Sequence, residues 1–299
     1  MMPLTVVDLA AFERVNPPKI KTSNFQLAFS ILPKEERIAI NTIYSLFSYI
    51  DSIVDDGAIS DENILKKEKR LKFWRAVIDE LYNDSIPSPI FYPLYYAIKR
   101  FSIPKQYIVT LFDGCRKDLF QTRYSTFNEL KDYCYSVASV VGLIVIEIFG
   151  YKYPETRNYA INLGYAMQLT NILRDVKKDK DRGYVYIPQE DLKKFEYTEE
   201  ELLNEVYNDN FVELMHFETK RTREFFHKAR SLLHPEERIT MFPAEVMDEI
   251  YYRLLEKIEL KGFNVFKKEI KVSTIHKLTI TLKHWLSILL FIKPFTKAD

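Results

Sequence analysis

Apolar residues recur along most of this chain at the three- and four-residue steps of an α-helix. Pro33 opens the first clear example, whose apolar positions share one face: Ile40, Ile43, Tyr44, Phe47, Ile50 and Val54. The same steps predict further helices at about 62–82, 90–101, 104–122, 127–149, 154–178, 199–207, 211–233, 243–260 and 273–292, with an extended piece at 184–188. No linker rich in Pro, Gly or Ser divides the chain, so we expect one all-α domain over residues 1–299, although the length also permits two.

Two of these predicted helices differ from the others. Segment 127–149 is apolar on nearly all sides and contains the small residues Ser136, Ala138, Ser139 and Gly142. This pattern indicates a central helix that its neighbours approach closely. Segment 273–292 combines apolar positions with lysines, and we interpret it as a helix that covers the core. The alternative is an interfacial helix that makes peripheral contact with a membrane.

Composition narrows the function classes. The chain has 299 residues, is 47% hydrophobic, and carries a net charge of +1 from 43 Lys and Arg against 42 Asp and Glu. Such a balance gives no broad cationic footprint, so we expect no nucleic-acid partner. With 7 Gly and no G-x-G-x-x-G, a Gly-rich nucleotide loop is not expected. The two cysteines form no C-x-x-C and the amino terminus has no long apolar run, which favours a cytoplasmic location.

Two acidic pairs carry the clearest chemical signal. Asp51 and Asp55 lie four residues apart on one helical face, and Asp175 and Asp179 repeat that spacing. Like charges at this spacing destabilise a helix, so the pairs need a counter-charge. One pair alone is typical of a solvated acidic surface. Two pairs favour a site for Mg²⁺ bound jointly by carboxylates and a phosphate, and the second pair follows three polar residues at helical spacing: Gln168, Asn171 and Arg174.

These residues resemble the squalene/phytoene synthase family. Residues 171–176 with Asp179, followed by 182–188, are similar to the family's second aspartate-rich motif and flap. Ile43-Tyr44 leading to Asp51 and Asp55 resembles the first motif. The resemblance extends to 133–142, 25–33 and 262–266, and so covers about residues 20–285.

The resemblance implies an all-α isoprenoid synthase bundle around a central hydrophobic cavity. It also implies head-to-head condensation of two prenyl diphosphates, farnesyl or geranylgeranyl, through a cyclopropylcarbinyl diphosphate to squalene, phytoene or dehydrosqualene. Mg²⁺, with Mn²⁺ as an alternative, would be held by Asp51, Asp55, Asp175, Asp179 and Asn171. NADPH would be needed only for squalene.

The remaining implied roles concern the substrate. Arg174 and Lys268 would balance the diphosphate charge. The expected diphosphate-binding residues are Tyr44, Tyr133, Asn171, Gln168 and Tyr251, with Tyr133 also expected to act in catalysis. Phe25, Phe29 and the central helix would form the cavity wall. The segment 180–188 would be a flap, with Gly183 as hinge and cations from Lys180 and Arg182. Asp113 and Asp118 are interpreted as parts of an exposed helix face.

The chain departs from the family pattern at four positions. Ser48 stands where an Arg is usual, Ser52 where many members have an Asp, and Lys177 and Lys178 where Gly and Glu are usual. These changes redistribute charge around both motifs. Two alternatives therefore stay open: a non-catalytic binding or assembly protein that keeps the fold, and a head-to-tail prenyl synthase or terpene cyclase. Retention of both acidic pairs argues against the first, and the sequence around Asn171 argues against the second.

Overall fold

The computed structural model describes residues 29, 32–55 and 61–291, with the side chains of Asp55, Asp61 and 287–291 left out of the description. Its helices are α3 (Lys34–Asp55), α4 (Asp61–Tyr82), α5 (Tyr92–Arg100), α6 (Lys105–Lys117), α7 (Phe127–Cys134), α8 (Val140–Phe149), α9 (Glu155–Asp181), α10 (Gln189–Lys194), α11 (Glu199–Leu203), α12 (Asp209–Leu232), α13 (Phe242–Leu260) and α14 (Thr274–Phe291). Short 3₁₀ turns precede α5 and α13. Within the described ranges there is no strand, only an isolated bridge between Arg123 and Val185. The predicted all-α class is confirmed.

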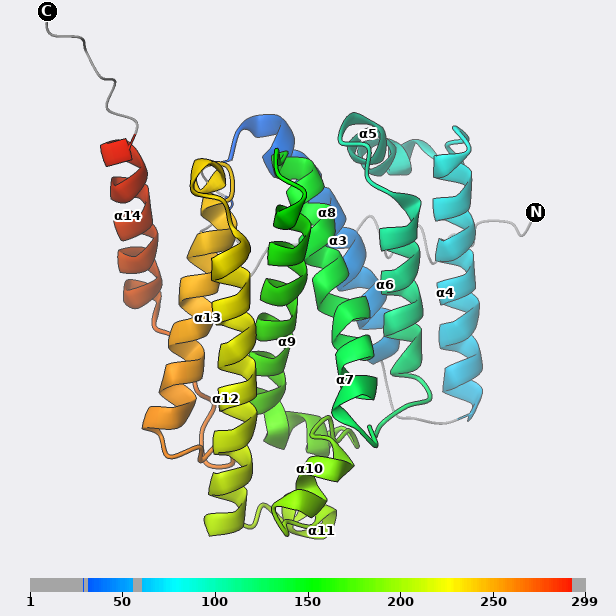
Figure 1. The fold of residues 1–299 in the computed structure, drawn as a ribbon. Helices are drawn as coiled ribbons and strands as arrows, with labels where there is room; N and C mark the ends of the chain where they lie inside the picture. Colours follow the sequence, from blue (N-terminus) through cyan, green and yellow to red (C-terminus); the bar gives the residue numbers. More distant parts are fainter. Residues whose placement is uncertain (1–28, 30–31, 56–60, 292–299) are drawn as a thin grey trace, which may run out of the picture.

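The long helices lie side by side, with α9 in the middle (Figure 1). Helix α9 packs against α8, α12 and α13, while α3 packs against α4, α5, α6 and α8. Helix α14 lies at one flank, where it contacts α13. Both α3 and α9 run downward in Figure 1, so their carboxyl-terminal ends lie at the same end of the bundle. The two predicted aspartate motifs, on the last turns of α3 and α9, therefore lie at the same end of the bundle.

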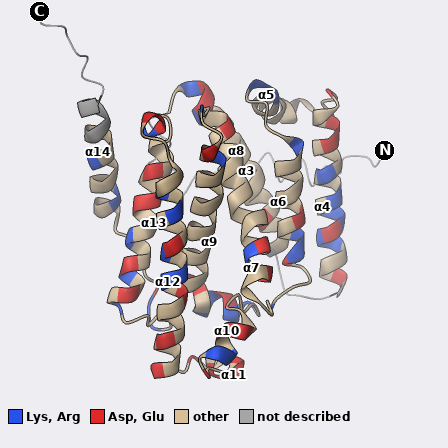
Figure 2. Cartoon of the chain, viewed as in Figure 1, with Lys and Arg blue, Asp and Glu red and all other residues tan. Residues whose placement is uncertain are grey.

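Two hydrophobic clusters hold this arrangement together. One joins α9, α12 and α13, and the other joins α3, α4, α5 and α6, and both include residues of α8. In α3, Leu46, Ile50 and Ile53 are completely buried, and each such side chain contributes about 1.5–3 kcal/mol. Figure 2 shows charge along the outer faces of α4, α12 and α13, whereas the middle of α9 carries none. That uncharged stretch, residues 158–173, belongs to the core.

The central helix spans Phe127–Phe149 and contains one π-helical stretch, Tyr135–Ser139. Its neighbours come as close as the small residues predict. A Cβ added at Gly164 of α9 would lie 2.5 Å from the Ser139 Cα, and one added at Gly142 would lie 2.9 Å from the Ala160 carbonyl oxygen. By length and composition this helix could cross a membrane, but half of its most apolar window is buried inside the bundle. We interpret it as the core helix.

The structure differs from the predicted elements in three places. Helix α6 ends at Lys117 rather than near 122, because the backbone from Thr122 to Ser125 bonds to residues 185–190 instead. Helix α11 ends at Leu203, and its Thr198 capping box marks its start. Helix α10 was not predicted. It begins directly after Pro188 and has six residues, too few to show a helical period.

Candidate active site

An apolar cavity of about 200 Å³ lies between the central helix, α9 and α13. Phe29 and ten aliphatic side chains form its wall: Val137, Ala138, Val141, Val145, Ile146, Ala160, Leu163, Met167, Ala244 and Met247. The predicted cavity is present, and Phe29 lies where the sequence predicts it. Phe25, the other predicted wall residue, lies outside the described residues. Such a wall suits a hydrocarbon chain and leaves little polar surface for water.

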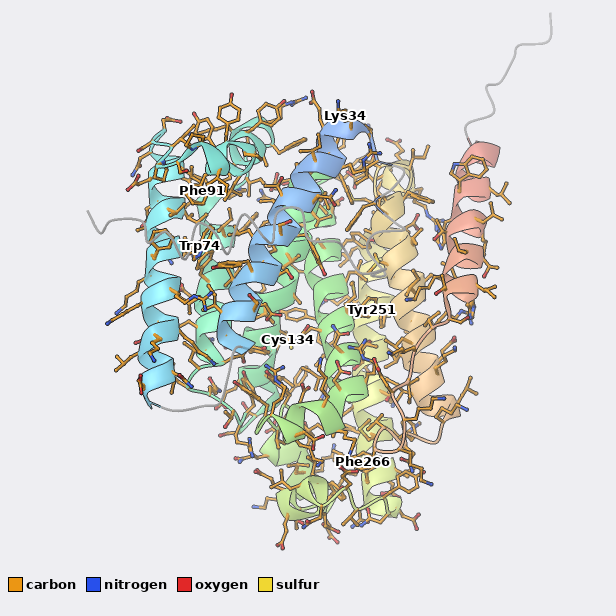
Figure 3. The ribbon with its side chains drawn as sticks, turned by 180° about the vertical axis from the view of Figure 1, so that it is seen from behind. Lys34, Trp74, Phe91, Cys134, Tyr251 and Phe266 are labelled. Atoms are coloured by element: carbon orange, nitrogen blue, oxygen red, sulfur yellow. The ribbon has the colours of Figure 1, made fainter. Side chains whose placement is uncertain are left out.

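Polar side chains gather at one end of this cavity. Gln168 and Asn171 of α9 line it there, together with Tyr251 of α13, which Figure 3 labels near the middle of the bundle. The Asn171 Oδ1 atom is buried and has no hydrogen-bond partner among the described residues. Because a buried carbonyl oxygen normally has a partner, this atom is suited to a ligand or a metal ion. Three predicted substrate-binding residues thus meet at one place.

Arg174 and the second acidic pair follow one turn later on α9. The Arg174 Nε atom donates to Asp175 Oδ1 at 2.8 Å, and a second guanidinium nitrogen donates to Asp175 Oδ2. Burial, and then the neighbouring Asp175 charge, raise the pKa of Asp179 to about 7, against the opposing effect of Lys178, Arg182 and Arg174. A carboxyl group in this position is under-compensated by protein cations. A divalent cation would supply the missing positive charge.

The first motif lies on the last turns of α3. Asp51 is exposed there, and the half-buried Tyr44 lies near enough that burial and then the Asp51 charge raise the pKa of its hydroxyl. Asp55 is the last residue of α3, and its side chain lies outside the described part. Among the described side chains, no three His, Cys, Asp or Glu residues form a complete metal site.

Tyr133 is not among the residues that line this cavity, and it lies in a cluster of tyrosines. Its hydroxyl donates to Asp118 Oδ2 at 2.8 Å, and its ring stacks on Tyr186 at a centroid distance of 5.4 Å. The Tyr186 hydroxyl also donates to Asp118, at 3.3 Å, and the Tyr184 hydroxyl donates to the Asp118 backbone carbonyl at 2.8 Å. Asp118 is therefore an anchor for three tyrosines and not a simple surface residue. The interpretation of Asp118 as exposed was wrong, whereas Asp113 is exposed and lies 3.6 Å from Arg75.

The predicted flap is docked against the protein. Gly183 has a φ of 90°, as a hinge residue can, and the Val185 N–H donates to the Thr122 carbonyl at 3.0 Å. Lys180 points away from the acidic pair, because its Nζ atom lies 2.9 Å from Glu205 and 2.7 Å from Asp181. Lys177 also pairs with Glu205. The role expected for Lys180 was therefore wrong, whereas Arg182 lies close enough to affect Asp179.

Lys268 is exposed on the connection between α13 and α14. Its neighbour Glu269 lies close enough to Arg174 to contribute to the raised pKa of that guanidinium. The connection thus passes near the acidic end of the cavity. The diphosphate role expected for Lys268 stays a prediction.

Comparison with known proteins agrees with this geometry. The squalene/phytoene synthase family model matches residues 19–276. The chain is 32% identical over 266 residues to a 15-cis-phytoene synthase from Synechococcus elongatus, covering 85% of each chain. It is 33% identical over 270 residues to a phytoene synthase from Arthrospira platensis, again covering 85% of each.

Solved structures show the same fold. A dehydrosqualene synthase aligns with a TM-score of 0.79 at 23% identity, covering 95% of this chain and 97% of its own. A squalene synthase from Alicyclobacillus acidocaldarius aligns with a TM-score of 0.75 at 22% identity, covering 87% and 97%. The helical bundle therefore has the fold of these two solved structures. The chain belongs to the squalene/phytoene synthase family and is a prenyltransferase of that type.

Proposed function

We propose that this protein condenses two molecules of geranylgeranyl diphosphate head to head to phytoene, in a reaction that depends on Mg²⁺. The observation that carries the proposal is an apolar cavity with Asn171 and Tyr251 at its polar end. Asp175 follows Asn171 by about one helical turn on α9. The names of the curated relatives support the phytoene product. We infer the C20 substrate from that product, because two C20 chains give its carbon skeleton.

The proposed reaction balances without an oxidant or reductant. The C1–O bond of one diphosphate breaks, C1 bonds to the double bond of the second molecule, and a proton leaves to give the cyclopropylcarbinyl diphosphate. The second diphosphate then departs, the carbon skeleton rearranges, and loss of another proton forms the central double bond. Two diphosphates and one hydrocarbon result. No step requires NADPH.

Different residues would bind the metal, balance the diphosphate charge and exclude water. Asp51, Asp175 and Asp179 would hold Mg²⁺, which when bound supplies Lewis-acid stabilisation of a departing diphosphate. Arg174 is oriented by its bonds to Asp175 and adds positive charge beside the leaving group. Asn171 and the Tyr251 hydroxyl offer polar atoms at the cavity mouth. The apolar wall beyond them excludes water, which would otherwise capture the allylic cation as an alcohol.

Purified protein incubated with geranylgeranyl or farnesyl diphosphate and Mg²⁺ tests the reaction. We expect diphosphate release and phytoene from the C20 substrate, loss of both with EDTA, and no effect of NADPH. If the protein converts only the C15 substrate, and converts it to dehydrosqualene, the substrate is farnesyl diphosphate and not the C20 compound. No diphosphate release from either substrate would refute the proposed activity.

We also propose that α14 makes peripheral contact with a membrane, from the cytoplasmic side. Five apolar residues on it are exposed: Ile275, Leu278, Leu282, Trp285 and Leu286. The helix has no acidic residue but carries Lys277 and Lys283, so it is complementary to an anionic surface. A water-insoluble product would benefit from delivery directly to the bilayer.

Co-sedimentation with vesicles that contain anionic lipid tests this contact. We expect the double variant Leu282→Glu/Leu286→Glu to lose binding. Leu203→Glu is the matched control, because Leu203 is similarly exposed but lies on α11, on the opposite end of the bundle from the tip of α14. Equal binding of the double variant and the wild type would exclude α14 as the contact.

A further inference from the structure

Tyr159, on the first turns of α9, lies between two different cavities. Its ring belongs to the wall of the apolar cavity, together with Ile146 and Ala244. The same residue also lines a second cavity of about 380 Å³, located between α9, α12, α13 and α14. Tyr159 is the one residue that the two described linings share. One aromatic ring thus separates them.

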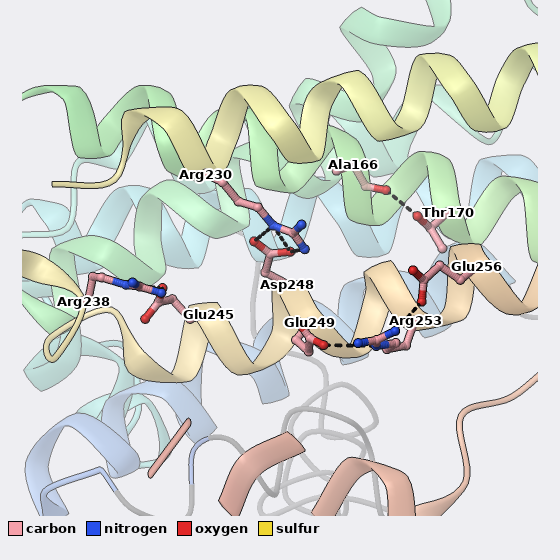
Figure 4. Close-up of polar contacts among 9 residues, drawn as sticks. All are labelled: Ala166, Thr170, Arg230, Arg238, Glu245, Asp248, Glu249, Arg253 and Glu256. Carbon is pink, nitrogen blue, oxygen red and sulfur yellow. Dashed lines mark hydrogen bonds and ion pairs between the residues drawn. The ribbon is translucent and has the colours of Figure 1, made fainter. Parts of the chain in front are cut away.

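The second cavity has a polar lining in which charges are paired. Arg230 of α12 bonds to Asp248 of α13 through two nitrogens, at 3.0 Å and 2.6 Å, and Arg238 lies 2.7 Å from Glu245 (Figure 4). His284 of α14 and Glu249 complete the polar part of the lining. A hydrocarbon chain that entered this space would have to displace any water around two ion pairs, which is unfavourable. The boundary between the cavities is therefore also a boundary of polarity.

The orientation of Tyr159 matches its place at that boundary. The residue is 1% exposed, and its hydroxyl has no hydrogen-bond partner within the described part of the chain. Burial, and then the charges of Asp248 and Glu245, raise the pKa of this hydroxyl, and both acids line the charged cavity together with Tyr159. A buried tyrosine hydroxyl usually has a partner, and a polar cavity of this size has room for a water molecule that could serve. The ring then faces the apolar side and the oxygen the polar side.

Tyr159 also lies at the far end of the apolar cavity. Asn171, at the polar end, follows it by 12 residues on the same helix, which corresponds to about 18 Å along the axis at about 1.5 Å per residue. Among the α9 residues that line the cavity, Tyr159 comes first. A prenyl chain whose diphosphate lies beside Asn171 would extend along α9 toward this ring.

We propose that the Tyr159 ring is the floor of the substrate cavity and sets the longest prenyl chain that the protein accepts. This role rests on the proposed prenyl diphosphate chemistry, and it makes Tyr159 a specificity-determining residue rather than a catalytic one. The paired charges behind the ring make the limit a sharp one. A longer chain would meet an aromatic wall, and behind it only ion pairs.

Steady-state turnover of all-trans C15, C20 and C25 diphosphates by Tyr159 variants tests the proposal. The readout is the ratio of kcat/KM for the C25 substrate to that for the C20 substrate, followed by diphosphate release. We expect Tyr159→Ala to raise this ratio at least tenfold. Tyr159→Phe keeps the ring and should stay within twofold of the wild type. Leu163→Ala enlarges the side wall instead of the floor and should leave the ratio within threefold.

The outcomes separate this proposal from the proposed function. An unchanged ratio in a folded, active Tyr159→Ala protein, or an equal rise in Leu163→Ala, would overturn the floor assignment. Tyr159→Leu, which removes less volume, replaces the alanine variant if thermal melting shows that the latter does not fold. If the wild type turns over no substrate, the proposed function fails, and the floor is then tested by the ratio of Kd values for thio-analogues of the C20 and C25 diphosphates. A tenfold shift of that ratio in Tyr159→Ala would support the floor, and no shift would refute it.

Discussion

The two ends of the apolar cavity use the same residue types in opposite ways. At the Asn171 end, Arg174 bonds to Asp175, and burial with the Asp175 charge raises the pKa of Asp179 to about 7 against the opposing effect of Lys178, Arg182 and Arg174. At the Tyr159 end, each of the acids Asp248 and Glu245 has its own arginine. Burial raises the pKa of Asp248 and Glu245 as well, so the two ends differ in the ion pairs that their acids make rather than in burial. Burial of acids alone therefore does not mark an active site; the missing counter-charge does.

The largest expected effect is that of Asp175→Asn. Loss of this carboxylate should lower kcat by about 10²–10³-fold, the usual result of removing one stabilising group from a charged transition state. The free energy of unfolding should change by no more than about 1 kcal/mol, because the lost bond to Arg174 is offset by relief of repulsion with Asp179. Diphosphate release and urea unfolding measure the two effects.

Asp181→Asn is the matched control for this substitution. Asp181 is an exposed acid at the end of the same helix, bonded to Lys180, and its loss should leave kcat nearly unchanged. Equal losses of activity in the two variants would show that general acidity of this helix end, and not the site, supports turnover.

Asp248→Asn should act mainly on stability. The substitution leaves Arg230 without its charge partner in a partly buried site, and we expect a loss of about 2–3 kcal/mol, below the full cost of breaking a buried pair because the Arg230 side chain is 36% exposed. The kcat of the folded fraction should stay near that of the wild type. Urea unfolding and turnover at low temperature check both points.

The double variant Arg230→Met/Asp248→Leu controls for this charge effect. Replacement of both partners by apolar groups should regain most of the lost stability, since no uncompensated charge remains. A double variant as unstable as Asp248→Asn would mean that packing, and not the ion pair, holds α12 against α13.

A third cluster of charged residues is intermediate in its charge pairing between the Asn171 end and the Tyr159 end of the cavity. Glu218 of α12 and Asp191 of α10 share the single Arg221, at 2.9 Å and 2.7 Å, and burial raises the pKa of Glu218 to about 8. The folded protein therefore keeps a proton on this carboxyl that the unfolded chain releases above its ordinary value of 4.5. The contribution of this group to the free energy of unfolding is fully present below pH 4.5 and is lost as the pH rises through about 8.

Unfolding measured at pH 6 and pH 9 tests this linkage. Relative to Glu218→Gln, the free energy of unfolding of the wild type should fall by about 3 kcal/mol between the two pH values. Glu213→Gln, on the exposed side of the same helix, should retain the wild-type slope. A wild-type profile as flat as that of Glu218→Gln would mean that Arg221 keeps both acids ionised throughout.

Sequence patterns predicted most of the fold because each long helix buries one face. The period of 3.6 residues is visible in α3, and the small residues of the central helix report its close approach to α9. Gln168 and Asn171 line the cavity, and Asp175 follows them on the same helix. Local patterns suffice where one element supplies the whole arrangement.

The missed features all depend on contacts between distant segments. Asp118 binds Tyr133 and Tyr186, which lie 15 and 68 positions away in the chain. Lys180 is drawn from the site by Glu205, which follows a different helix. Tyr159 has no local signal at all, because its importance comes from the charged cavity that α12, α13 and α14 build behind it. Only tertiary structure could reveal these three roles.

The smallest expected effect belongs to Lys177→Ala. This lysine stands where the family usually has a small residue, and in sequence it adds a cation next to the second acidic pair. In the structure it pairs with Glu205, while Lys178 is the lysine that lowers the pKa of Asp179.

Lys177→Ala should therefore lower the free energy of unfolding by less than about 1 kcal/mol, because a partly exposed ion pair contributes little. Glu205→Gln should have the same small effect. The Mg²⁺ concentration that gives half-maximal diphosphate release should stay within about twofold of the wild type in both, since neither side chain faces the acids. A several-fold lower requirement for Mg²⁺ in Lys177→Ala alone would show that this lysine competes with the metal. The acids at the Asn171 end would then have a protein counter-charge, as the acids at the Tyr159 end do.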